Sequence, residues 1–400
     1  MKIEIPFEKL EFNNILSNDV YPFKKIKDDS SFLKKLFFLF KKTLTVLYNS
    51  IFYSPSIKKN SVNLKIFYIR TFDRPDIKIN SFYYEQIEGT TVCILSRKIK
   101  KINFDIFIHT IVNLFKSRKY WMKVLQKNEI KLLSYQGFFL LTVLYEAYSQ
   151  TSKILPLALK HEKLVSSQQC EPTENMICQL ANLNKIETYG LQTSLNIYNE
   201  SKTQDSSLIS YDYFKILDYL NPVCKNILCW GAINKSIYEK YTKANVHIIG
   251  KAGMPDIDYI EKGATIIFEQ NMFETTNNKL FQISNFLEDN EIKVSRWFRK
   301  GNPLAKNGIL RDGPLRKVVI GLNSTLLADL GFLGLEIYAY KGSSFENLVP
   351  SNLIINKMDE LLNKFHLKNK YPHEIWKNFI ECSQEESVKK YKSFLMKSIN

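Results

Sequence analysis

The sequence is poor in the residue patterns that build metal centres. Its six cysteines are scattered over 400 residues without a C-x-x-C pair, and none of the five histidines stands at finger spacing from them. These absences argue against a structural zinc site and favour a reducing compartment. The printed chain also holds no internal repeat and no G-x-G-x-x-G after a strand-like run, which argues against a Rossmann dehydrogenase.

Long uninterrupted apolar runs are missing too. The opening MKIEIPFEKLEF carries charges where a signal peptide would have its apolar core, which predicts a cytoplasmic protein. The nearest approach to a membrane segment, residues 32–53, is interrupted by Lys34, Lys35, Lys41 and Lys42. A lysine at the centre of a spanning helix costs about 2.5–3.5 kcal/mol. We therefore expect an amphipathic helix that either packs on its own domain or lies on the inner face of the cell membrane.

Acidic residues are outnumbered by basic ones. The chain has 56 Lys and Arg against 40 Asp and Glu, for a formal net charge of +16. Such an excess favours anionic partners, although solvated lysine faces account for part of it. A nucleic-acid binder would gather basic and aromatic residues on one face. Here the lysines are spread along the chain and the aromatic residues lie mostly in apolar periodic segments, so we predict no nucleic-acid partner.

What is present is an alternation of strand-like and helix-like segments. The length predicts two domains. Helical spacing covers residues 102–127 and 131–149, and from residue 162 onward a βαβ rhythm predicts parallel strands. The predicted strands are 162–169, 185–192, 225–230, 245–249, 264–268, 292–298, 317–321 and 335–340, and the predicted helices among them include 171–182 and 275–290. Glycines and a proline cluster within 240–262. We predict an α/β protein with domains 1–243 and 244–400 and a ligand crevice between them.

One strand-to-helix junction bears two hydroxyls. The stretch KVVIGLNSTLLADLGFLGLEIYAY, residues 317–340, passes from a strand-like run through Asn323, Ser324 and Thr325 into a helix-like run. Hydroxyls at a helix start cap backbone N–H groups, and the positive end of the helix dipole also favours a phosphate. The junction is therefore either an ordinary cap or a phosphate site.

The order of several short motifs resembles a known group of enzymes. Residues 320–325 (IGLNST), with Asp329 and Gly334 after them, resemble the donor-phosphate segment of GT-B glycosyltransferases that build bacterial surface polysaccharides. That group includes polysialyltransferase-like capsule enzymes and the related CDP-glycerol glycerophosphotransferases. In the first half, residues 164–195 and the CWGAINKSIYEKY stretch at 229–241 are similar to further segments of the group. The resemblance covers about residues 160–350 and implies a GT-B fold, two Rossmann-like domains facing a central cleft.

Two motifs depart from the pattern of the group. Where it has Gln-His-Gly, this chain has Gln192, Thr193 and Ser194, and where it has His-Pro, this chain has WFRK at 297–300. The usual imidazoles are therefore missing, and the chemistry is either performed by other groups or lost. His161 stands before a predicted strand, where a structural histidine is the better interpretation.

Carboxylates and cations can replace those imidazoles. Glu171 and Glu174 follow a predicted strand and are candidates for the base, although acidic residues also favour helix starts. Arg296 would stabilise the leaving phosphate, unless its cluster is only a solvated loop. The resemblance places the donor at Arg299, Lys300, Asn302, Asn323, Ser324 and Thr325. It places the acceptor at Gln192, Thr193 and Ser194.

The function implied by the resemblance is glycosyl transfer. We expect an inverting, metal-independent transfer from a CMP- or UDP-linked sugar to a surface-polysaccharide or lipid-linked saccharide, with no cofactor. Two alternatives remain: a polyol-phosphate transferase that uses a CDP donor, and an inactive GT-B-like protein that binds nucleotide or glycan.

Overall fold

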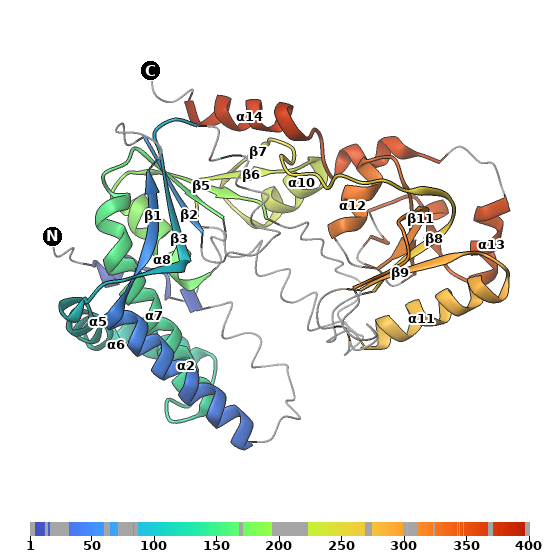
Figure 1. Cartoon of the computed structure of the whole chain (residues 1–400). Coiled ribbons are helices and arrows are strands. Elements are labelled where there is room, and N and C mark those ends of the chain that lie inside the picture. The colour runs from blue at the N-terminus through green and yellow to red at the C-terminus, as the bar shows by residue number, and fades with distance from the viewer. Residues whose placement is uncertain are drawn as a thin grey trace.

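The structure is a computed structural model of the whole chain. The residues it describes are 5–12, 15–16, 32–59, 65–70, 83, 87–167, 171–193, 223–268, 274–298, 302, 310–322, 325–341, 343, 345–346, 348–366 and 371–396. They form two sheets with helices around each (Figure 1). We call the first sheet and its helices the first lobe, and the second sheet and its helices the second lobe.

The first sheet contains seven strands in the described part of the chain. They are β1 (Tyr53–Lys59), β2 (Ile66–Arg70), β3 (Thr90–Lys100), β4 (Lys163–Ser166), β5 (Glu187–Leu191), β6 (Asn226–Cys229) and β7 (Asn245–Ile248). Their order across the sheet is β1-β3-β2-β4-β5-β6-β7. Only β1 runs antiparallel to its neighbour among these pairs. Strands β2, β4 and β6 are buried at every position, as expected for parallel strands covered on both faces.

Helices cover both faces of this sheet. The helices α7 (Tyr135–Ala158) and α8 (Pro172–Leu183) share one buried cluster with Phe67 and Ile69 of β2. The hydroxyl of Ser134 caps α7 by accepting a hydrogen bond from Gly137 N at 3.1 Å. Three further helices of this lobe are α2 (Phe32–Phe52), α5 (Phe104–Lys116) and α6 (Arg118–Lys127), and α10 (Ala232–Tyr241) follows β6. Residues 102–127, with one continuous helical spacing, form two helices that divide at Ser117.

The second sheet contains six strands among the described residues. They are β8 (Ile260–Phe268), β9 (Val294–Phe298), β10 (Arg311–Asp312), β11 (Arg316–Gly321), β12 (Glu336–Tyr340) and β13 (Ile354–Ile355). Their order is β10-β9-β8-β11-β12-β13, with only β10 antiparallel among these pairs. The helices of this lobe are α11 (Glu274–Asp289), α12 (Thr325–Phe332) and α13 (Met358–His366).

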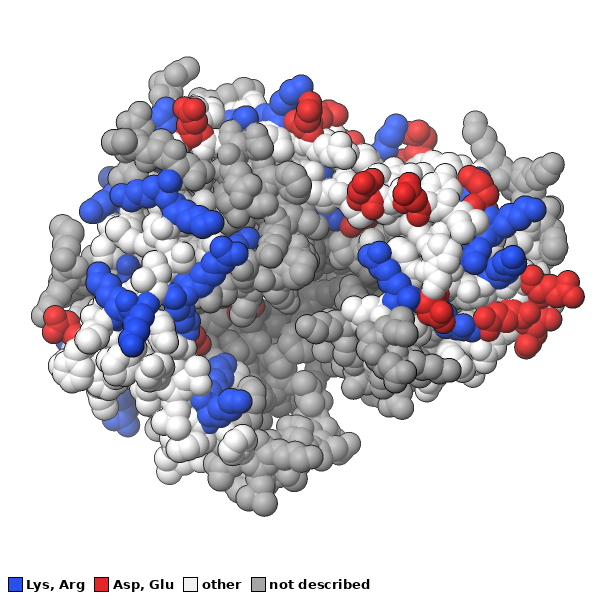
Figure 2. Space-filling view, viewed as in Figure 1, with Lys and Arg blue, Asp and Glu red and all other residues white. Residues whose placement is uncertain are grey.

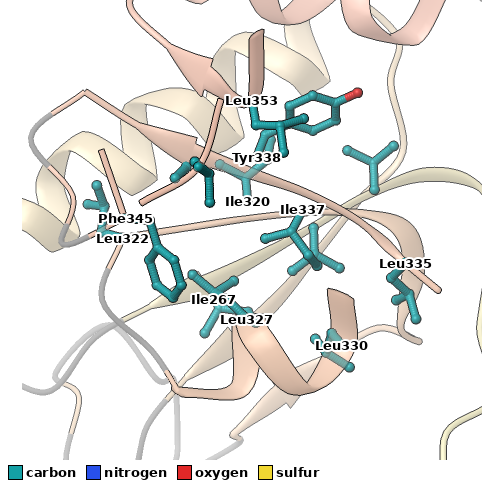
Figure 3. Close-up of a cluster of buried hydrophobic side chains, with 14 of the residues drawn as sticks. Ile267, Ile320, Leu322, Leu327, Leu330, Leu335, Ile337, Tyr338, Phe345 and Leu353 are labelled. Carbon is teal, nitrogen blue, oxygen red and sulfur yellow. The ribbon is translucent and has the colours of Figure 1, made fainter. Parts of the chain in front are cut away.

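An apolar core joins these elements of the second lobe. Ile267 of β8 and Ile337 of β12 lie on the same side of the sheet as Leu327 of α12 (Figure 3). Ile320 of β11 lies with Tyr338 on the other side of the sheet. The same cluster includes Trp230, which follows β6 of the first lobe. The core of the second lobe therefore extends to the boundary with the first.

The C-terminal helix α14 (Gln384–Met396) returns to the first lobe and covers the face opposite α7 and α8 (Figure 1). Its Tyr391 and Leu395 pack with Ile66, Tyr68 and other residues of the first sheet. The buried Lys163, at the start of β4, donates a hydrogen bond to the carbonyl of Leu395. The chain thus passes between the lobes once after β7 and again before α14.

The predicted division at residues 243 and 244 stays a prediction. Strand β7, which lies beyond that division, belongs to the first sheet. Helix α14, also beyond it, packs on the first sheet. The strands predicted from residue 162 onward are all confirmed, with ends shifted by a few residues. Strands β1, β2 and β3 were not predicted.

Candidate functional site

Each sheet has a topological switch point. In the first sheet, the chain leaves β2 for β3 on one side and later returns to β4 on the other. In the second, it leaves β8 for β9 on one side and later returns to β11 on the other. Ligands of open parallel α/β sheets bind outside the carboxyl ends of the strands at such points. The junctions β2/β4 and β8/β11 are therefore the places to look for a site.

At the first switch point, the two predicted carboxylates, Glu171 and Glu174, lie at the start of α8, the helix that follows β4 in the chain. Glu171 is the N-cap residue of α8 and is partly exposed. Glu174, one turn later, is fully buried and accepts a hydrogen bond from Ser166, the last residue of β4. Burial raises the pKa of the Cys93 thiol on β3, and the nearby charge of Glu174 raises it further. Glu174 therefore lies beneath the sheet on the α8 side, and Glu171 is the carboxylate with exposed surface.

Arg70 belongs to the same switch point and was missed in the sequence. It is the last residue of β2 and its side chain is 2% exposed. Next to it, Ser167 continues the ladder by donating from its backbone N to Ile69 O at 3.2 Å. The buried Ser167 Oγ has no hydrogen-bond partner among the described residues. The signal that could have indicated Arg70 is an arginine that ends an otherwise apolar run, IFYIR.

Gln192 and Thr193 lie at the same edge of the first sheet, after β5. Gln192 donates from its backbone N to Leu228 O at 3.0 Å, and its Oε1 accepts from Trp230 N at 2.8 Å. This amide oxygen therefore joins the ends of β5 and β6. Thr193 is partly exposed, and Ser194 lies outside the described residues. An acceptor-binding role for the three stays a prediction.

At the second switch point, α12 begins directly after β11. Thr325 is the first residue of this helix, whereas Asn323 and Ser324 lie outside the described residues. A Cβ on Gly321, the last residue of β11, would come within 2.9 Å of Leu327 Cδ2. Glycine here allows α12 to pack closely on its strand, and this packing places the helix start at the edge of the sheet.

Asp329 of α12 forms a buried ion pair with Lys251, which follows β7. The Lys251 Nζ lies 2.5 Å and 2.6 Å from the two carboxylate oxygens of Asp329 and 4.6 Å from the centre of the Trp230 ring. Burial raises the pKa of Asp329, and the Lys251 ammonium opposes that shift. The ion pair therefore joins α12, at the second switch point, to the segment that follows β7 of the first sheet.

The predicted basic cluster is described only in part. Arg296 on β9 donates a hydrogen bond to Glu288 of α11 and lies 3.8 Å from Asp312 of β10. It is therefore engaged with two carboxylates of its own lobe. Asn302 is buried, and Arg299 and Lys300 lie outside the described residues. The leaving-group and donor roles of these four residues stay predictions.

The described histidines and acidic residues form no additional catalytic or metal-binding cluster. The ring nitrogens of His161 lie 2.8 Å from Leu157 O and 2.8 Å from Thr91 Oγ1, and burial lowers its pKa. The prediction of a structural histidine is confirmed. Among the described residues, no three His, Cys, Asp or Glu side chains gather into a possible metal site. Metal independence stays a prediction.

Solved structures with low sequence identity to this chain have a similar fold. One similar structure is described as a UDP-N-acetylglucosamine 2-epimerase from Listeria monocytogenes; it is 11% identical, with 84% of this chain and 98% of that chain covered at a TM-score of 0.50. Another is the glycotransferase of kitacinnamycin, 7% identical, with 85% and 98% covered at a TM-score of 0.43, which is too low to carry an argument. No protein-family model and no curated protein sequence matches the chain.

The first likeness shows the fold. The chain has the predicted GT-B architecture of two Rossmann-like domains facing a central cleft.

Proposed function

We propose that this protein is a glycosyltransferase that moves a sugar from a CMP- or UDP-linked donor to a surface-polysaccharide or lipid-linked saccharide. The observation that carries the proposal is the position of α12. This helix starts at the switch point of the second sheet, which is where an open α/β sheet binds its ligand. The free N–H groups and the positive dipole end of a helix favour a phosphate. Thr325, and Ser324 before it, would bind the donor phosphates.

The acceptor would bind at the first switch point. Glu171 is the better candidate for the base because it is partly exposed, whereas Glu174 is fully buried beneath the sheet. In an inverting transfer the base would remove the proton of the acceptor hydroxyl as that oxygen attacks the sugar carbon. Gln192, Thr193 and Ser194 would position the acceptor.

Positive charge would stabilise the leaving nucleotide phosphate. Arg299, Lys300 and Asn302 follow β9, beside the second switch point in the sheet order, and would supply that charge and hydrogen bonds. Arg296 would act with them only if a ligand drew it from Glu288 and Asp312, because both carboxylates engage it within the second lobe.

The decisive experiment is calorimetric titration of the purified chain with CMP, UDP and CDP. UDP is included partly because one similar structure is described as acting on a UDP-sugar. The test variant is Ser324→Ala/Thr325→Ala. Hydrogen bonds to charged groups contribute roughly 1.5–3 kcal/mol each, so nucleotide affinity should fall at least about tenfold.

The matched control is Ser134→Ala. Ser134 caps α7 through Gly137, so its loss should cost about 1 kcal/mol of stability without weakening nucleotide binding. If the double variant behaves like Ser134→Ala, the Ser-Thr pair is only a helix cap and the proposal fails. It also fails if the wild type binds none of the three nucleotides. Selective binding of CDP would favour the polyol-phosphate alternative, and binding without sugar transfer would favour an inactive GT-B-like protein.

A further inference from the structure

Helix α2 leaves a stripe of large apolar side chains in solvent. Phe37, Phe40, Leu44 and Tyr48 are all strongly exposed, and their spacing places them on one face of the helix. Leu39 and Val46 are buried, and α2 packs on α7. The helix therefore docks on its own lobe with one face and presents a second apolar face outward.

Helix α5 carries a second stripe of the same kind. Phe104, Ile108, Val112 and Phe115 recur every three or four residues and are exposed, with Phe115 at 70%. The end of α2 lies at the start of α5, since Lys101 N donates to Phe52 O at 2.7 Å and Asn103 N donates to Ile51 O at 2.6 Å. The two helices also contact each other. The stripes of α2 and α5 form what we call the apolar surface.

Exposed apolar residues continue beside this surface. Ile99 at the end of β3, Ile102 before α5, and Leu133 and Phe138 at the start of α7 are also strongly exposed. Large exposed apolar patches on a protein usually mark an interaction site. Scattered single residues would need no such explanation.

The charge around the apolar surface is predominantly positive. Residues 97–119 contain Arg97, Lys98, Lys100, Lys101, Lys116, Arg118 and Lys119 against the single acidic Asp105. Residues 32–53 contain lysines and no acidic residue. Lys and Arg side chains gather over the lobe that holds α2 and α5, whereas the second lobe presents both signs side by side (Figure 2).

From this combination we infer that the apolar surface docks on an anionic phospholipid bilayer. The aromatic side chains of α2 and α5 would enter the boundary between headgroups and acyl chains, and the surrounding lysines would contact the phosphates. No helix in the described part of the chain has the length and apolar character needed to cross a bilayer. The contact is therefore with the membrane surface. It goes beyond the proposed sugar transfer and holds whether or not the chain is catalytic.

The test is sedimentation of the full chain with vesicles of phosphatidylcholine, with and without phosphatidylglycerol. We expect binding to the anionic vesicles, weaker binding to the neutral ones, and a decrease as salt is raised. The variant Phe40→Ser/Phe115→Ser should lose at least about tenfold in vesicle affinity, because two aromatic side chains no longer enter the bilayer. Both residues are exposed, so the fold should remain intact, as a thermal melt would verify.

The matched control is Phe281→Ser, which removes an exposed aromatic residue of α11 in the second lobe. This variant should bind vesicles like the wild type. The inference is overturned if the wild type does not sediment with anionic vesicles, or if Phe281→Ser weakens binding as much as the double variant does. It is also overturned if light scattering shows a dimer that Phe40→Ser/Phe115→Ser dissociates, because the apolar surface would then bind a second copy. Nucleotide titration without vesicles keeps this result separate from the proposed transfer.

Discussion

At the residue scale, the two acidic side chains of α8 show how position alone separates candidates of the same chemistry. Glu171 precedes the helix and retains exposed surface, whereas Glu174 turns beneath the sheet toward Ser166 and Cys93. A base must reach the acceptor, so exposed surface favours Glu171. Glu174 instead contributes to the packing of α8 on β4.

This difference predicts different stabilities for the two alanine variants. Glu174→Ala should lower the free energy of unfolding by about 2–4 kcal/mol, because it removes a fully buried side chain and leaves Ser166 without its acceptor. Glu171→Ala should stay within about 1 kcal/mol of the wild type. Urea unfolding at neutral pH measures both values. Equal losses for the two variants would contradict the described burial.

At the element scale, α2 is held at its C-terminal end by a lysine of another helix. Lys153 of α7 donates to Asn49 O at 3.2 Å and Tyr53 O at 2.6 Å, so its ammonium lies against the carbonyls that end the helix. Burial, together with the charge of the neighbouring Lys98, lowers the pKa of Lys153 to about 8. The contact links the end of α2 to α7, the helix on which α2 packs.

This lowered pKa predicts a pH dependence of stability. The ordinary lysine pKa of 10.5 applies to the unfolded chain, so above pH 8 the unfolded state binds more protons than the folded state. The contribution of Lys153 to the free energy of unfolding should therefore rise with pH from about 8 to about 9.5, below the range where the unfolded tyrosines ionise. The buried cysteine thiols, whose pKa values are raised, contribute in the opposite direction, so the comparison is between the wild type and Lys153→Met. The variant should have the less positive slope of unfolding free energy against pH in urea unfolding series. Equal slopes for the two proteins would contradict the assignment.

At the scale of the whole molecule, the two lobes are joined by buried polar contacts where the chain crosses twice. Lys251 follows β7 and pairs with Asp329 of α12, and its backbone N donates to Cys382 O at 2.9 Å on the return toward α14. Trp230 packs into the core of the second lobe. The position of α12 relative to the first sheet is thus tied to a few residues at one junction.

Removing one partner of this ion pair should be costly. Asp329→Ala should lower the free energy of unfolding by about 3–5 kcal/mol, because the Lys251 charge remains buried without its carboxylate. The matched control Asp312→Ala removes an exposed carboxylate 3.8 Å from Arg296 and should cost at most about 1 kcal/mol. Calorimetric unfolding compares the two variants. The double variant Lys251→Met/Asp329→Leu should recover much of the lost stability. Equal losses for Asp329→Ala and Asp312→Ala would contradict the buried ion pair.

Much of the fold was predictable from the sequence because its signals are local. Apolar runs such as KVVIG and KNILCW, bounded by turn residues, predicted the strands from residue 162 onward. The Asn-Ser-Thr stretch predicted the start of a helix, which begins at Thr325. Strand β1 was missed for an equally local reason: it reads YSPSIKK, with a proline and lysines that suit an edge strand better than an apolar run. Strands β2 (IFYIR) and β3 (TTVCILSRKIK) hold apolar runs like those of the predicted strands, so both were predictable.

The tertiary structure alone decided which distant residues meet. Strand order depends on the crossover connections, so the sequence could not indicate that β2 lies beside β4 and brings Arg70 close to Ser167. It could not separate the buried Glu174 from Glu171, nor pair Lys251 with Asp329 across 78 residues. Local propensities determine where helices and strands form. The switch points, the burial of each carboxylate and the outward face of α2 depend on packing between segments remote in the chain.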